Sequence, residues 1–308
     1  MSKVFSVGEG AAIMRINEEA GLLERALIHT IRRSTDVGLR ATGFRRRFVE
    51  TSLGRVHALD MKGEGELPPL VLFHGLGSRA TDYMRLMQGL RSQHRRLLAL
   101  DMPGHGRSWT PRPYAGSRPV RQSMMEAADV LLDEPAILFG NSLGGLVAIR
   151  YALERPERAL GLMLVNPGGA PLNDEELAQL LSRFKFDTRA DSERFIDGLL
   201  GRSTRLKGVL AWGVRRRMSR SGTRQLIERI DHSDLLSPEE LARLSAPIYF
   251  FWGRRDRILP DSNRRFFLEH LPAGTRVDQP EDYGHVPYID DHRAFLEIVR
   301  GFARSLAD

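Results

Sequence analysis

From residue 46 to the end of the chain, short apolar runs alternate with longer segments of helical pattern. The runs "PLVLFHG" at 69–75, "AILFG" at 136–140 and "APIYFFWG" at 246–253 are apolar almost throughout, with no alternation of polar residues. Strands of this kind are typical of a parallel sheet that helices cover on both faces. The sequence therefore predicts an α/β fold with a mostly parallel sheet flanked by helices.

The alternation stops between residues 170 and 245, a stretch rich in charged residues and helix formers. Several apolar residues in this stretch recur at helical steps and predict one apolar helix face: Leu206, Val209, Leu210, Val214 and Met218. We expect residues 170–245 to form a helical insertion before the last two strands, so that residues 46–169 and 246–308 make up the α/β core.

Residues 1–45 precede this core and have a pattern of their own. Apolar residues at steps of three and four predict an amphipathic helix: Ile13, Ile16, Ala20, Leu23, Leu27 and Ile31. Several arginines follow this predicted helix. A helix of this kind packs on its own domain, lies on a membrane surface or contacts a second copy of the chain. The sequence leaves open which of these residues 11–33 do.

Composition narrows the chemistry. The 308 residues include no cysteine, which excludes disulfides, thiolate metal sites and cysteine nucleophiles. The net charge is +7, but arginines and acids are interleaved and no nucleic-acid-binding motif is present, so no nucleic-acid partner is expected. No apolar run reaches the roughly 18 to 20 residues that span a bilayer, and no signal-peptide pattern is visible, which predicts a cytoplasmic location. No cluster has metal-ligand spacing, so neither a metal nor an organic cofactor is expected.

The segment "ILFGNSLGGL" at 137–146 places Ser142 between glycines, after a predicted strand and before a predicted helix. A small-x-Ser-x-small pattern in that context fits a nucleophile elbow, a sharp turn that exposes the serine hydroxyl. The glycines let neighbouring backbones pass closely. From this segment alone, a serine that caps the following helix is an equally good interpretation.

A serine nucleophile needs a base and a carboxylate that orients the base. His285, in "DYGHVPY", follows the last predicted strand, and Asp256, in "FFWGRRDRILP", follows another. Catalytic groups of open α/β sheets gather at the carboxyl ends of strands. The order Ser142, Asp256, His285 is the order of an α/β-hydrolase triad. We therefore predict these three as the catalytic residues.

The negatively charged oxygen of a tetrahedral intermediate requires N–H donors. The amide of Leu143 directly follows the nucleophile, at the start of a predicted helix where amides lack partners. The second donor is expected in the loop "FHGLGS", where Leu76 is the candidate. Leu76 and Leu143 are thus the predicted oxyanion hole.

Over residues 46–305 the chain resembles the α/β-hydrolase superfamily, with the helical insertion as the cap of that family. The resemblance is carried by five motifs in the order and spacing of the superfamily: "HGLG", "DMPGHGRS", "GNSLGG", "WGRRDRILP" and "YGHVPY". It implies that His74 and His105 shape the loops around the site and that Asp101 orders its own turn.

The resemblance also bears on the reaction. Asn166 stands where some relatives carry an alternative acid, and an amide cannot serve as that acid, which favours Asp256. Haloalkane dehalogenases and epoxide hydrolases of this fold have aspartate at the elbow, so Ser142 favours acyl transfer. Carbon–carbon bond hydrolases share "GNS-x-GG", but they usually show a proline in the oxyanion loop and a tryptophan after the base histidine. This chain has "HGLGSRA" and "GHVPY" there.

These observations predict a carboxylic ester hydrolase that forms an acyl-enzyme on Ser142 and takes a small-molecule ester with an apolar acyl or alcohol part. Leu210 and Trp212, apolar residues of the cap, are the predicted substrate-binding residues. Two alternatives stay open: a carbon–carbon bond hydrolase of ring-cleavage diketones, and a non-catalytic binding module of the same fold.

Overall fold

The computed structural model describes residues 38–39, 41–110, 116–218, 221–230 and 235–307. The chain divides into two compact units, Met1–Arg45 and Arg46–Asp308. The amphipathic helix expected within residues 11–33 falls outside the described residues, so its contact with a membrane or a second copy stays a prediction. No helix in the described part of the chain combines the length and the apolar character needed to cross a bilayer.

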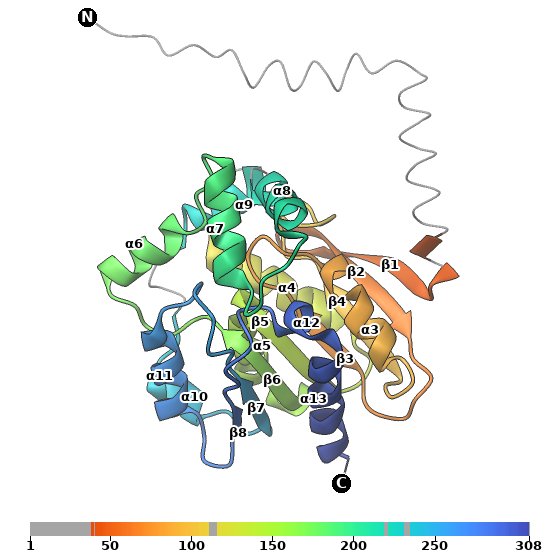
Figure 1. The fold of residues 1–308 in the computed structure, drawn as a ribbon. Coiled ribbons are helices and arrows are strands. Elements are labelled where there is room, and N and C mark those ends of the chain that lie inside the picture. Colours follow the sequence, from red (N-terminus) through yellow and green to blue (C-terminus); the bar gives the residue numbers. More distant parts are fainter. Residues whose placement is uncertain (1–37, 40, 111–115, 219–220, 231–234, 308) are drawn as a thin grey trace, which may run out of the picture. The chain divides into compact units, whose positions relative to one another are not determined.

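An eight-stranded, mostly parallel sheet with helices on both faces confirms the predicted fold class (Figure 1). The spatial order is β1-β2-β4-β3-β5-β6-β7-β8; β2 runs antiparallel to β4, and the pairs from β4 to β8 are parallel. The strands are β1 (Phe44–Thr51), β2 (Gly54–Lys62), β3 (Leu70–Phe73), β4 (Arg96–Leu100), β5 (Ala136–Ser142), β6 (Ala159–Pro167), β7 (Ile248–Phe251) and β8 (Arg276–Asp278).

The strand order reverses at β3. After β3 the chain crosses to β4 on one side, and it returns to place β5 on the other side. The carboxyl ends of strands at such a reversal form the crevice in which open α/β sheets bind ligands. The loop after β3 and the turn from β5 into α5 therefore lie at the position where a site is expected.

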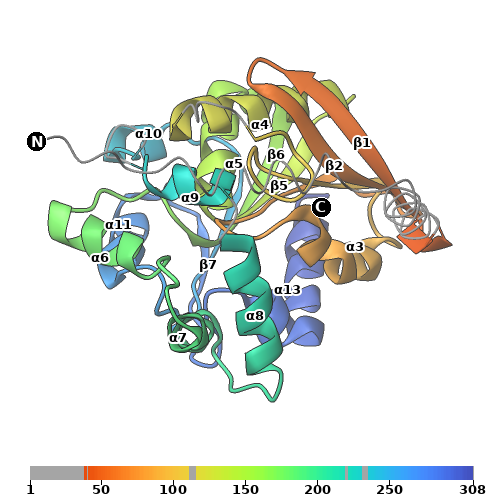
Figure 2. The ribbon, with the colours of Figure 1, turned by 90° about the horizontal axis from the view of Figure 1, so that it is seen from above.

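The helices cover the sheet from two sides (Figure 2). On one side, Phe139 of β5 packs against Phe295 of α13. On the other side, its neighbour Leu138 joins the large apolar core with residues of α4, α5 and α11. Successive side chains of a strand point to opposite faces, which is why a strand covered on both sides is apolar throughout. The core helices are α3 (Met84–Leu90), α4 (Ser117–Leu131), α5 (Leu143–Glu154), α11 (Asp261–His270), α12 (Pro287–Asp290) and α13 (His292–Ser305), with short 3₁₀ turns at Ala80–Tyr83 and Pro156–Arg158.

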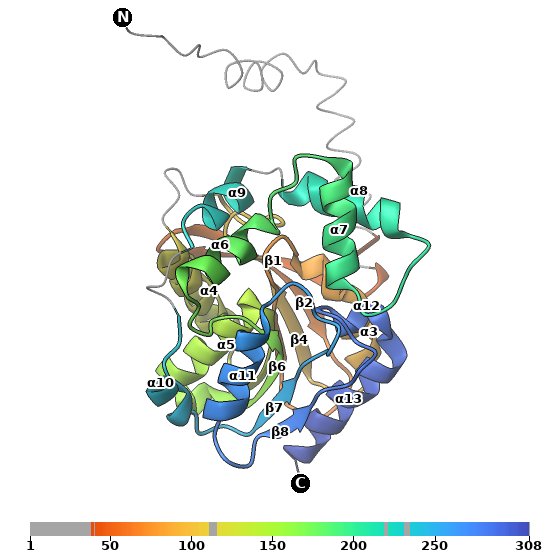
Figure 3. The same ribbon diagram turned by 60° about the vertical axis from the view of Figure 1, so that its left-hand side comes forward.

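The helical insertion lies between β6 and β7, as expected, and its helices α7, α8 and α9 stand over one end of the sheet (Figures 1 and 3). We call this insertion the cap; its helices are α6 (Asp174–Ser182), α7 (Arg189–Leu199), α8 (Lys207–Met218), α9 (Ser221–Ile227) and α10 (Pro238–Ala242). Capping boxes start three of them, at Asn173, Thr188 and Ser237. These side chains satisfy amides that a helix start leaves unpaired.

One expectation for the cap was wrong. The apolar residues from Leu206 to Met218 do not form a single face. Val214 and Met218 turn inward together with Ala211, whereas Leu206 and Val209 are exposed. The reason is that α8 carries apolar residues on both sides, so its contacts with the core, and not its periodicity, decide which side is buried.

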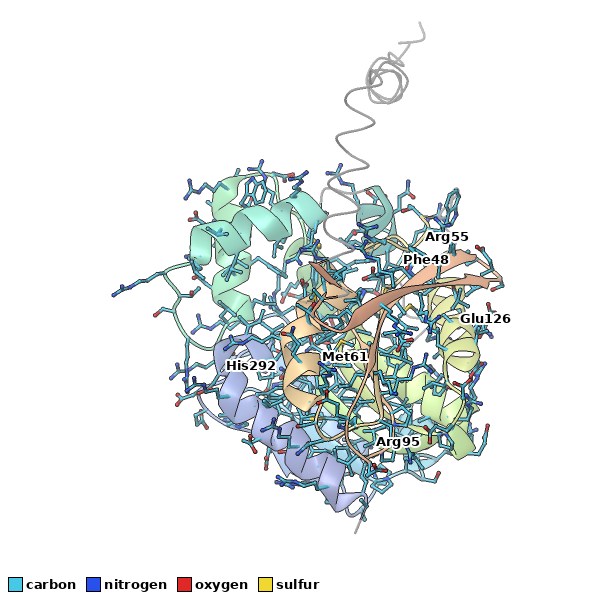
Figure 4. The ribbon with its side chains drawn as sticks, turned by 90° about the vertical axis from the view of Figure 1, so that its right-hand side faces the viewer. Phe48, Arg55, Met61, Arg95, Glu126 and His292 are labelled. Atoms are coloured by element: carbon cyan, nitrogen blue, oxygen red, sulfur yellow. The ribbon has the colours of Figure 1, made fainter. Side chains whose placement is uncertain are left out.

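The β1–β2 pair forms the edge of the sheet shown in Figure 4. The Arg55 guanidinium of β2 lies 4.8 Å from the centre of the Phe48 ring of β1. At the turn between the two strands, Glu126 of α4 accepts hydrogen bonds from the amide and the hydroxyl of Ser52, at 2.8 and 2.9 Å. These contacts fix the turn on the helix layer.

Candidate active site

Ser142 is the last residue of β5 and directly precedes α5. Its φ of 56° and ψ of −126° lie where few residues other than glycine are found. Its hydroxyl makes no capping hydrogen bond to α5. A side chain at Gly144 would overlap the Phe73 carbonyl, so α5 can cross β3 this closely only with glycine there. The turn is therefore strained, and the serine hydroxyl is not used to cap the helix.

His285 lies in the loop between β8 and α12, with its Nδ1 2.6 Å from Oδ2 of Asp256. The two side chains are 5% and 0% exposed. Oδ1 of Asp256 accepts the amides of Ile258 and Leu259, at 2.7 and 3.2 Å. The carboxylate is thus held by the backbone of its own loop. A carboxylate at Nδ1 keeps the ring proton there and leaves Nε2 as an acceptor.

Two buried asparagines hold the backbone of His285, and sequence reasoning missed both. Nδ2 of Asn141 donates to the His285 carbonyl at 3.0 Å, and Nδ2 of Asn166 donates to the same carbonyl at 2.9 Å. Asn166 also donates to the Gly284 carbonyl at 3.0 Å and accepts the Gly253 amide at 2.8 Å. It thereby ties the loop that carries Asp256 to the loop that carries His285. The available signal was its place near the carboxyl end of β6.

Two buried histidines shape the loop after β3. The Met102 amide donates to Nε2 of His74 at 3.0 Å, so Nδ1 carries the proton and donates to the Gly75 carbonyl at 2.8 Å. Burial lowers the pKa of His74, which agrees with a neutral ring. The Gly77 amide donates to Nε2 of His105 at 3.1 Å. Both rings act on the backbone of this loop.

The same loop passes directly against Ser142. A Cβ placed on Gly75 would lie 2.8 Å from Cβ of Ser142. Leu76 and Leu143 both line a cavity that Ser142 also lines. Leu143 is the first residue of α5, where an amide has no partner within the helix. In the part of the chain that the structure describes, neither amide donates to a protein acceptor.

Asp101, at the end of β4, connects this loop to its own turn. Oδ1 accepts the Ala80 amide at 2.7 Å, and Oδ2 accepts the Arg107 amide at 2.9 Å and lies 2.7 Å from Nδ1 of His57. Burial raises the pKa of Asp101, but these hydrogen bonds outweigh burial and hold that pKa below its ordinary value. Among the described residues, no three His, Asp or Glu side chains gather as a metal site requires.

Two cavities meet at Ser142, and both are also lined by Leu76 and Phe184. The first is lined by His285 and by apolar residues, most of them from the cap; its lining includes Phe195, Leu199, Val214, Met218, Ile258 and Val286. The second is lined largely by aliphatic residues, among them Leu143, Leu146, Leu172, Leu177, Leu180, Leu181, Leu235 and Leu259. The space around Ser142 is therefore apolar on both sides.

Leu210 and Trp212 line neither of these cavities. Trp212 is 64% exposed and points away from the core, and Leu210 is half-buried. The residues of α8 that do line the first cavity are Val214, Arg217 and Met218.

The C-terminal end of α8 also touches the loop after β3. The guanidinium of Arg217 donates from one nitrogen to both carboxylate oxygens of Asp82, at 2.8 and 3.1 Å. Asp82 accepts from Ser78 as well, at 2.9 Å. A Cβ on Gly77 would overlap the Met218 sulfur, so the cap packs here against bare backbone. The C-terminal end of α8 is therefore in direct contact with this loop.

A strained serine after a parallel strand, an aspartate–histidine pair at two neighbouring strand ends and a helical insertion over them define the class of the protein. The chain belongs to the alpha/beta hydrolase family, whose model matches residues 70–298.

Among individual proteins, the chain is 31% identical over 257 residues to the pimeloyl-[acyl-carrier protein] methyl ester esterase of Aeromonas salmonicida; the match covers 77% of this chain and 96% of that enzyme. Two solved structures share the fold. A bacterial membrane phospholipase A has a TM-score of 0.76 at 23% identity, covering 97% of both chains. The 2-hydroxy-6-oxo-6-phenylhexa-2,4-dienoate hydrolase of Rhodococcus sp. strain RHA1 has a TM-score of 0.74 at 23% identity, covering 85% of this chain and 99% of its own.

Proposed function

We propose that the protein is a serine hydrolase that cleaves a carboxylic ester through an acyl-enzyme on Ser142. The observation that carries the proposal is the 2.6 Å contact between His285 and Asp256, with Ser142 and His285 lining one cavity. An oriented imidazole that lines the same cavity as a serine in a strained turn is the arrangement that acyl transfer requires. The esterase of Aeromonas salmonicida supports an ester as the substrate.

In the first step Ser142 Oγ attacks the ester carbonyl carbon while Nε2 of His285 takes the hydroxyl proton. Asp256 stabilises the imidazolium that results. The amides of Leu76 and Leu143 donate to the negatively charged oxygen of the tetrahedral intermediate. The bond from carbon to the alcohol oxygen then breaks, and His285 returns the proton to the departing alcohol.

In the second step water attacks the acyl-enzyme, and His285 again takes the proton. The new tetrahedral intermediate uses the same two amides. When it collapses, the bond to Ser142 Oγ breaks, the serine regains its proton from His285, and the acid leaves. Each step depends on His285 as the base that takes a proton and returns it.

The two cavities support a substrate with an apolar acyl or alcohol part. On α6, Leu177, Leu180 and Leu181 are half-buried and line the second cavity. Burying a chain of methylene groups there is favourable by about 0.8 kcal/mol for each group. We therefore place one apolar arm of the ester against α6 and the other in the cavity beneath α7 and α8.

The experiment is labelling by a fluorophosphonate together with hydrolysis of p-nitrophenyl esters of increasing chain length. The wild type should take up one equivalent of probe, and Ser142→Ala should take up none and lose roughly 10⁴- to 10⁶-fold in kcat. The control is Ser262→Ala, a serine on α11 outside both cavities, which should label normally. Labelling that persists in Ser142→Ala would refute the nucleophile.

The same assay separates the alternatives. A vinylogous diketone of the ring-cleavage type is offered beside the esters. If only the diketone is cleaved, the carbon–carbon reaction replaces ester hydrolysis. If neither class is cleaved and the wild type takes up no probe, the chain is a binding module of this fold.

A further inference from the structure

The outward side of α8 exposes an unusual amount of apolar surface. Leu206, just before the helix, and Val209 and Trp212 on it are 61%, 67% and 64% exposed. Among the described residues, these are three of the four most exposed large hydrophobic side chains; the fourth, Val130 at 65%, lies on α4. Steps of three residues place Leu206, Val209 and Trp212 in one row along the helix. We call this row the α8 stripe.

The charges around the α8 stripe are all positive along the chain. Between Asp197 and Glu228 the sequence has no acidic residue and eight basic ones. Arg205 stands at one end of the stripe, and Arg215 and Arg216 stand at the other, all three exposed. The Arg216 guanidinium lies 5.5 Å from the centre of the Trp212 ring. An exposed apolar row with cations at both ends is complementary to a surface that is apolar inside and anionic outside.

Acids of neighbouring elements offset only part of this charge. Lys207 pairs with Asp197 of α7, and Arg217 pairs with Asp82 of the core. Arg189 and Arg194 of α7 pair with acids of their own helix. Arg205 and Arg216 form no ion pair with an acid in the described part of the chain. Two arginines beside the α8 stripe thus carry a positive charge that no acid of the described residues neutralises.

We propose that the α8 stripe docks the protein on an anionic lipid surface. Trp212, Val209 and Leu206 would enter the boundary between headgroups and acyl chains, and Arg205 and Arg216 would contact lipid phosphates. The opposite side of the same helix lines the cavity that holds Ser142, through Val214 and Met218. Docking would therefore bring the lipid surface next to the catalytic cavity. The proposal does not depend on the reaction at Ser142.

The experiment is co-sedimentation of the full-length protein with vesicles of phosphatidylcholine alone or with about one third phosphatidylglycerol. The wild type should bind the anionic vesicles, and salt should weaken the binding. Val209→Ser/Trp212→Ser should reduce the partition coefficient by about tenfold or more, since it removes two buried side chains from the lipid contact. Arg205→Gln/Arg216→Gln should remove most of the preference for anionic vesicles.

The matched control is Val130→Ser, which replaces an equally exposed valine on α4 and should bind like the wild type. Urea unfolding of each variant checks that the fold is unchanged. Three outcomes would overturn the proposal: no binding by the wild type, equal binding by Val209→Ser/Trp212→Ser, or equal loss with Val130→Ser. Binding to an acidic protein in place of vesicles, lost in the same variants, would assign the α8 stripe to a protein partner and would also overturn it.

Discussion

Asn166 should be essential for the position of His285 although it does not touch the substrate. Its amide group makes three hydrogen bonds, to the carbonyls of Gly284 and His285 and from the amide of Gly253. The residue is fully buried and has φ 42°. Asn166→Gly keeps that backbone conformation accessible and deletes all three bonds, so the lost bonds, and not backbone strain, cause the effect.

The loss of stability in Asn166→Gly comes from the buried groups that lose a hydrogen-bond partner. The His285 carbonyl keeps its bond from Asn141, so two buried groups lose their partner: the Gly253 amide and the Gly284 carbonyl. A buried group without a partner costs about 1 to 3 kcal/mol, so the free energy of unfolding should fall by about 2 to 6 kcal/mol. A displacement of His285 by about 1 Å should reduce kcat by about 10²-fold on a p-nitrophenyl ester, since acyl transfer depends on near-attack geometry.

A second variant at Asn166 and a control variant elsewhere separate the effect of displacing His285 from the effect of lowering the stability of the fold. Asn166→Asp keeps the shape and the acceptor for Gly253, but it places a second oxygen against two carbonyl oxygens. It should lose activity at least as strongly as Asn166→Gly. Leu97→Ala is the matched control, because it removes a buried side chain near the start of β4, away from the strand ends that carry the site. It should cost about 2 to 5 kcal/mol and leave kcat within about twofold at a temperature where all variants are folded.

The assay measures kcat and KM for one ester, with urea unfolding of the same preparations. If both Asn166 variants hydrolyse the ester like the wild type while their stability falls as expected, Asn166 is a structural residue only. If Leu97→Ala loses as much kcat as the Asn166 variants, the effect on activity is a general consequence of destabilisation.

Three further predictions concern other contacts of the site and core. Gly75→Ala should slow fluorophosphonate labelling by about 100-fold, because its Cβ would lie 2.8 Å from Cβ of Ser142; a labelling rate like the wild type's would contradict this. Asp82→Asn and Arg217→Gln should each cost about 0 to 1 kcal/mol in urea unfolding, since both side chains are partly exposed, and the double variant should cost no more than the larger single loss. Burial lowers the pKa of His94 below the 6.5 of an exposed histidine, so its contribution to stability is present above pH 6.5 and is lost as the pH falls through the lower, folded pKa. His94→Asn should therefore flatten the fall in unfolding free energy between about pH 7 and pH 5, by at most about 1.4 kcal/mol per pH unit.

The parallel sheet could be predicted because burial on both faces leaves runs such as those of β3, β5 and β7 apolar throughout. The contact between His285 and Asp256 could be expected because both follow strands, and parallel strands end at one edge of the sheet. The role of Asn166 could not, because its partner is the carbonyl of His285, 119 residues away. Every residue has a backbone carbonyl, so the sequence does not indicate which one accepts a hydrogen bond. An asparagine near the end of a strand has the same sequence pattern whether it holds a loop or faces water.

The sides of α8 show a different limit. When a helix is apolar on a single side, its sequence indicates which side is buried. Helix α8, however, has Ala211, Val214 and Met218 on one side and Val209 and Trp212 on the other. The residues of α8 alone therefore do not indicate which side is buried. The packing against the core determines it, since the bare backbone at Gly77 accommodates Met218. An apolar side that none of the described residues covers is exposed to water, where it is unfavourable. That imbalance, and not the periodicity of the helix, is the physical reason to seek an external surface for the α8 stripe.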